Sequence, residues 1–132
     1  MKKLIKIFAV IFICTQFLPK LSRAQSSCGN WARDAGSLIS LRQCVQYGYK
    51  NHQFFNGYSF RVHFWVVLTA TDGSTTGQDF NSGFYVNLYL EPNETSYNAA
   101  NDFPSGVNKD IAGWRITKKQ KQNANGAWED FY

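Results

Sequence analysis

The sequence has few of the residues from which metal centres and nucleophilic catalytic sites are built. It contains three cysteines and two histidines, His52 and His63, in 132 residues. No cysteine or histidine stands at the paired spacing that zinc sites use. There is no G-x-S-x-G segment, which would place a nucleophilic serine on a sharp strand-to-helix turn. These absences lead us to expect no metal, no cofactor and no catalytic residue.

The chain also lacks an apolar run long enough to cross a bilayer, which takes about 20 residues. Its main apolar run, residues 7–18, lies behind three lysines and is followed by the small residues Ser22 and Ala24. This order is typical of a secretory signal peptide. We expect residues 1–24 to be cleaved off and residues 25–132 to be exported, with no transmembrane segment in the mature chain. The domain would then be secreted, periplasmic or at the cell surface. An uncleaved membrane anchor is the alternative.

An excess of positive charge is absent from the expected mature domain. The whole chain carries a net charge of +5, but residues 1–24 hold five basic side chains and no acidic one. The remainder has nine basic and nine acidic residues. Because nucleic-acid binding needs a basic surface, we expect no nucleic-acid partner. The remaining basic cluster, Lys118, Lys119 and Lys121, is typical of a solvated strand end.

Two cysteines remain in the expected mature domain, because Cys14 is lost with the signal peptide. Cys28 and Cys44 form an even pair in an oxidising compartment, which predicts one disulfide. Closing this loop would stabilise the fold by about 3 kcal/mol through the entropy of the unfolded chain. Two separate buried thiols are the alternative.

Helix signals are scarce, and strand signals dominate. The best helix candidate is residues 30–38, which contain Gly36. Strict alternation over residues 58–70 predicts a strand whose even-numbered side chains form the core. We expect Phe60, Val62, Phe64 and Val66 in that core. Further strands are predicted at residues 37–49, 83–91, 111–122 and 127–132, with a long loop at 92–109.

Five or six strands separated by turn signals, without crossover helices, predict an all-β fold. About 108 mature residues suffice for one domain. We therefore expect a single antiparallel β-sandwich of about five to seven strands over residues 25–132, with a small barrel as the alternative. The strands at 58–70 and 83–91 are expected to pair as neighbours.

Two segments resemble small secreted bacterial immunoglobulin-like β-sandwich modules. They are FFNGYSFRVHFWVVL, residues 54–68, and VNLYLEPNETS, residues 86–96. Many such modules have an L-x-P-G-E type turn after the second strand. Leu90, Pro92 and Glu94 match this turn, and Asn93 replaces its glycine. The resemblance implies an immunoglobulin-like fold, an exported location, a function that is often unassigned and no catalytic residue.

The outward faces of the two aromatic strands carry the candidate binding residues. They are Arg61, His63, Trp65, Tyr85, Asn87 and Tyr89. Aromatic rings on a flat sheet suit stacking against sugar rings, and exposed aromatic patches often mark partner sites. Arg61 and Asn87 can orient a ligand. We expect a non-catalytic exported module that binds a glycan or a protein at the cell envelope. Alternatively, the N-terminal segment folds over this face and buries Trp65.

Two other functions are compatible with the sequence. The protein can be a structural or assembly component that pairs through a sheet edge, or a small hydrolase or an inhibitor of one. The segment DGSTTGQD, from Asp72 to Asp79, has oxygen-bearing residues suited to calcium but not the EF-hand spacing. The other histidine, His52, is expected to lie exposed in a turn.

Overall fold

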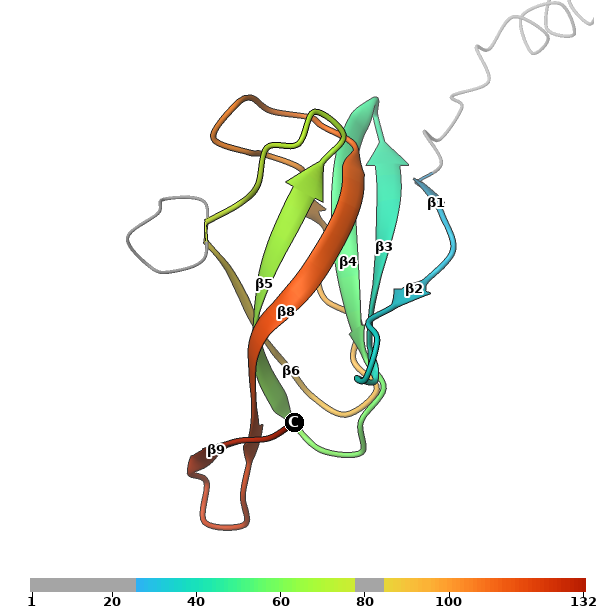
Figure 1. The fold of residues 1–132 in the computed structure, drawn as a ribbon. Helices are drawn as coiled ribbons and strands as arrows, with labels where there is room; N and C mark the ends of the chain where they lie inside the picture. Colours follow the sequence, from blue (N-terminus) through green and yellow to red (C-terminus); the bar gives the residue numbers. More distant parts are fainter. Residues whose placement is uncertain (1–25, 78–84) are drawn as a thin grey trace, which may run out of the picture.

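The computed structural model describes residues 26–77 and 85–132, so the predicted signal peptide lies outside the described residues. The described chain forms two antiparallel sheets packed face to face (Figure 1). The predicted all-β sandwich is confirmed, and the described residues form nine strands, of which three have two residues each. Its closer assignment as immunoglobulin-like stays a prediction. No helix within these two ranges is long and apolar enough to cross a membrane.

Sheet A is built around one long hairpin. β3 (Ile39–Gln46) pairs with β4 (Tyr49–Asn56), and Gln46 faces Tyr49 at the turn. Tyr47 and Gly48 at the turn have positive φ angles of 52° and 80°, as in the hairpin turns that match strand twist. The predicted single strand over residues 37–49 is wrong, because the chain reverses at 47–48. The sheet is completed by β1 (Ser27–Cys28) and β2 (Ala32–Arg33) on one side of β3 and by β7 (Ala99–Ala100) beside β4.

The N-terminal segment of the domain is extended, so the predicted helix at residues 30–38 is wrong. Ala32 and Arg33 pair with β3, and Gly36 has a φ of 83° in the turn that follows. Cys28 stands directly opposite Cys44, and the two form the predicted disulfide.

Sheet B has the order β6-β5-β8-β9. Its strands are β5 (Val62–Ala70), β6 (Val86–Leu90), β8 (Ile111–Gln122) and β9 (Trp128–Asp130). The predicted antiparallel pairing of the two aromatic strands is confirmed by β5 and β6. β5 begins four residues later than the alternation suggested, because residues 57–61 form the connection from β4.

The long, curved strand β8 contains two irregularities against β5 (Figure 1). The register shifts leave Thr117 and Ala112 as extra residues. Such bulges increase local twist and change which side chains share a face. After Thr117, the outer face receives Lys118, which lies opposite Trp65, and Gln120, which lies opposite His63. β9 pairs with only the last three residues of β8.

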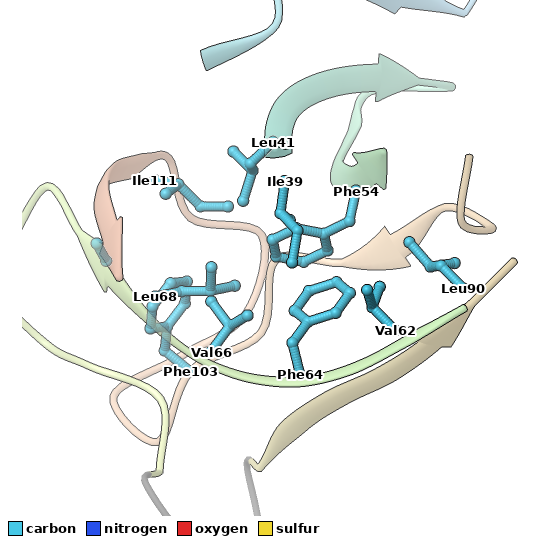
Figure 2. Packing of buried hydrophobic residues seen from close by; sticks show 11 residues of the cluster. Ile39, Leu41, Phe54, Val62, Phe64, Val66, Leu68, Leu90, Phe103 and Ile111 are labelled. Atoms are coloured by element: carbon cyan, nitrogen blue, oxygen red, sulfur yellow. The ribbon is translucent and has the colours of Figure 1, made fainter. Parts of the chain in front are cut away.

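The core lies between the sheets, and its centre is aromatic. Phe54 of β4 is fully buried and meets Phe64 of β5 edge to face, with ring centroids 5.4 Å apart. Trp114 of β8 contacts the same Phe54 ring at 5.7 Å. Figure 2 shows the Phe54 and Phe64 side chains pointing at each other from opposite sheets. The predicted core side chains Val62, Phe64 and Val66 are buried, and Phe60 packs against them.

A buried asparagine ties the two sheets together at the end of β4. Asn56 is 0% exposed, and its Nδ2 donates to the carbonyls of Phe60, Leu90 and Glu91 at 3.0, 3.2 and 2.9 Å. Its Oδ1 accepts from the backbone N–H of Tyr58 at 2.9 Å. One side chain therefore satisfies backbone groups from both the 57–61 connection and the end of β6.

Candidate functional site

The six predicted binding residues come together on the outer face of sheet B. On β5 and β6, Trp65 faces Asn87 and His63 faces Tyr89. The Trp65 indole N–H donates to the Tyr85 hydroxyl, and Arg61 lies just before β5 beside the Tyr89 ring. We call this surface the aromatic face. Its members are Arg61, His63, Trp65, Tyr85, Asn87 and Tyr89, joined by Lys118, Gln120, Trp128 and Asp130 from β8 and β9.

An imidazole forms the centre of the aromatic face. The His63 ring stacks on Tyr89 with centroids 3.7 Å apart and an angle of 16° between the planes. The Trp65 ring also packs against His63, with centroids 3.8 Å apart, and the Trp128 ring approaches His63 edge-on with centroids 5.6 Å apart. His63 is consequently only 6% exposed, whereas Tyr89 is 50% exposed. The face therefore presents the Tyr89 ring to solvent with the His63 imidazole stacked against it.

The contribution of β8 and β9 was not predicted from the sequence. Trp128 lies 5.4 Å from Tyr89, and the Gln120 amide donates to Asp130 at 2.8 Å. Alternation within residues 127–132 was a signal that Trp128 and Asp130 share a side. Which sheet face they join depends on the pairing of β9 with β8, and local periodicity does not encode that pairing.

The cations on the aromatic face are each matched by a carboxylate. Arg61 Nε lies 2.9 Å from Glu91 Oε1, and Lys118 Nζ lies 3.6 Å from Asp130 Oδ1. Lys118 also lies 5.1 Å from the centre of the Trp65 ring, a typical cation–π distance. The face is therefore aromatic and polar with balanced charge.

The N-terminal segment does not cover the aromatic face. β1 and β2 pair with β3 and so belong to sheet A, whereas Trp65 points outward from sheet B. The alternative in which this segment buries Trp65 is wrong. The disulfide explains the difference, because Cys28 is held beside Cys44 on the other sheet.

Burial favours the neutral form of the His63 imidazole. Burial lowers the pKa of His63 below its ordinary value, a hydrogen bond with Gln120 opposes this effect, and the nearby Lys118 charge lowers the pKa further. Within the described residues, neither histidine hydrogen-bonds to a serine or a cysteine. The His63 ring packs between Tyr89 and Trp65.

His52 is not exposed in a turn as predicted. It lies in β4, is 3% exposed, and its Nδ1 is 2.8 Å from Asn101 Oδ1. Asn101 is itself fully buried and donates through Nδ2 to the Lys109 carbonyl. Its Oδ1 is therefore the acceptor, and His52 Nδ1 carries the proton. Burial lowers the pKa of His52, and the Asn101 hydrogen bond only partly offsets this effect.

We expect the domain to lose stability as the pH falls below 6.5. Both histidines have an ordinary pKa of 6.5 when exposed, and burial lowers both values in the folded state. The unfolded chain therefore takes up protons first, and the free energy of unfolding decreases as acid is added. This contribution is complete above about pH 6.5 and is lost as the pH falls from there through the lowered pKa values of the folded state.

Urea unfolding across that pH window measures the effect. The variant His52→Gln should show a smaller decrease in unfolding free energy, since one of the two titrating groups is gone. An unchanged pH dependence in His52→Gln would contradict this assignment.

The possible calcium loop has a different arrangement in its described part. Asp72 pairs with the Lys109 ammonium and accepts from the Ser74 backbone and hydroxyl. The Lys109 contact and the Ser74 bonds hold the pKa of Asp72 well below its ordinary value. Asp79 lies outside the described residues. No group of three metal-ligating side chains occurs among residues 26–77 and 85–132.

Comparison with known proteins adds no relative to this description. No protein-family model, curated protein or solved structure matches the chain.

Proposed function

We propose that this protein is a non-catalytic glycan-binding module that acts outside the cytoplasm and binds a neutral saccharide through the aromatic face. The observation that carries the proposal is the half-exposed Tyr89 ring, supported from below by the His63 stack and flanked by Trp128. A sugar ring has an apolar C–H face that packs on such a ring, whose large and rigid surface loses little entropy on binding.

Polar groups around the rings supply the directional contacts that a saccharide needs. The Asn87 side chain is exposed beside Trp65, and Gln120 of β8 lies directly opposite His63 on β5. A few placed polar groups around an apolar surface are the usual composition of a small-ligand site. Because Arg61 and Lys118 already have carboxylate partners, a ligand without charge fits better than an acidic one.

Export is supported by two independent features of the chain. Residues 1–24 have the order of a signal peptide, and a disulfide such as Cys28–Cys44 forms and persists in oxidising compartments. A module at the envelope meets polysaccharides there, in agreement with the surface described above.

The substitution Tyr89→Ala should weaken saccharide binding roughly tenfold, which corresponds to the loss of one aromatic stacking contact. The measurement is calorimetric titration with the best binder from an array of neutral hexose and N-acetylhexosamine oligomers. Tyr89 is a better probe than Trp65, because the Trp65 ring is half-buried and its indole N–H also donates to the Tyr85 hydroxyl.

Tyr49→Ala is the matched control, because Tyr49 is 68% exposed on β4 of the other sheet. This control should bind like the unchanged protein, and both variants should melt close to it. Equal binding by Tyr89→Ala and the unchanged protein, or an array without any binder, would refute the proposed function.

A further inference from the structure

We propose that the outer face of sheet A carries a second, separate binding site, for a sugar ring that bears a carboxylate. The site is a hollow of about 480 Å³, a size within the usual range of small-ligand sites. It lies on the opposite side of the sandwich from the aromatic face. Its lining residues are Trp31, Ser40, Arg42, Phe55 and Thr95, and we call it the Arg42 pocket.

Trp31 and Phe55 give the Arg42 pocket its aromatic wall. Their ring centroids lie 5.8 Å apart at an angle of 50°, and Trp31 is 38% exposed. The two rings come from different parts of the chain, since Trp31 precedes β2 whereas Phe55 belongs to β4. An exposed tilted pair of this kind offers a surface on which the apolar face of a sugar ring can pack.

The position of Trp31 is fixed from both sides. Gly29 donates to the Gln43 carbonyl at 2.8 Å, while Ala32 pairs with Leu41. Residues 30 and 31 therefore pass opposite Arg42, and the indole lies under the guanidinium, with Arg42 Cζ 4.4 Å from the ring centre. Backbone pairing before and after Trp31 therefore fixes this wall of the pocket.

Arg42 is the group that selects an anion. Its Nε donates to Gln53 Oε1 at 2.9 Å, which orients the guanidinium. Within the described chain no carboxylate pairs with Arg42, in contrast to Arg61 on the aromatic face. A guanidinium that is oriented, stacked and without an acidic partner is suited to a two-pronged contact with a carboxylate.

Two hydroxyl groups complete the recognition of a sugar. Ser40 and Thr95 line the pocket, and neither side chain has a hydrogen-bond partner within residues 26–77 and 85–132. A hexuronic acid presents one carboxylate, one apolar ring face and several hydroxyls, so each element of the pocket has a counterpart on it. This inference uses none of the residues of the aromatic face and stands independently of the proposed function.

The test is calorimetric titration of the whole exported domain with an oligogalacturonate. The unchanged protein should bind it, and Arg42→Gln should weaken binding by roughly tenfold or more, since a hydrogen-bonded charge pair is lost. Arg115→Gln is the matched control, because Arg115 is an exposed arginine on β8 of the other sheet. Tyr89→Ala should also keep oligogalacturonate binding, which separates this site from the aromatic face.

Competition identifies what the Arg42 pocket recognises. Inorganic phosphate and a neutral galactose oligomer should both displace oligogalacturonate poorly, since each offers only one of the two required features. Absence of oligogalacturonate binding, equal binding by Arg42→Gln with an unchanged melting temperature, or full displacement by either competitor would overturn the proposal. Perturbation of the Trp31 indole signal in NMR spectra on titration should accompany binding and be absent with phosphate.

Discussion

Asn56→Ala should lower the free energy of unfolding by about 3–5 kcal/mol, because several buried backbone groups would lose their partners at about 1–3 kcal/mol each. Asn56 is fully buried and donates to the carbonyls of Phe60, Leu90 and Glu91. Small domains have a total stability of about 5–15 kcal/mol, so this loss is a large fraction. Urea denaturation followed by tryptophan fluorescence measures it.

Two companion variants separate hydrogen bonding from simple loss of volume. Asn56→Asp keeps the shape but replaces the donor amide by a carboxylate facing three carbonyl oxygens, so it should be at least as unstable as Asn56→Ala. Asn51→Ala, on the same strand, loses one exposed contact to the Tyr49 carbonyl and should change stability by less than about 1 kcal/mol. A mild effect of Asn56→Asp would contradict the role assigned to the amide.

Phe54→Ala should cost about 3–5 kcal/mol, the usual range for removing a buried phenylalanine. The Phe54 ring is 0% exposed and makes edge-to-face contacts with Phe64 and Trp114 from sheet B. Its removal would leave a cavity between the sheets that rigid neighbours cannot fill. For a domain of this size the melting temperature should fall by about 4–8 °C for each kcal/mol lost.

The adjacent residue supplies the control for this prediction. Phe55 has the same side chain but points to the outer face of sheet A, where it is half-buried beside Trp31. Phe55→Ala should therefore destabilise the domain by less than half as much as Phe54→Ala. Equal losses from the two variants would show that the core does not centre on Phe54.

Local alternation of apolar and polar residues correctly predicted strands β6 and β8 of sheet B. β8 has the predicted bounds, 111–122, and β6 places Leu88 and Leu90 inward and Tyr89 outward as expected. These features depend on period two within one segment. The turn at Tyr47 and Gly48 was missed because a tyrosine with positive φ breaks no hydrophobic pattern.

Two other errors concern contacts between distant parts of the chain. His52 stands in a polar stretch that reads as a turn, yet its burial depends on Asn101, 49 residues later. Similarly, Trp128 joins the aromatic face only because β9 pairs with β8 beyond the bulge at Thr117. Alternation predicted which side chains of β5 and β6 share a face, but it contained no information on what packs beside them.

The free side of β8 has a consequence for behaviour at high concentration. β9 covers only Gln120–Gln122, so residues 111–118 have no strand partner on that side within the described chain. An open edge of this length is a template for aggregation when it is flat and uncharged. Here the extra residues Ala112 and Thr117 bend the strand, and Lys118 and Lys119 place charge along it. The same irregularities that shape the aromatic face thus protect the domain against edge-to-edge association.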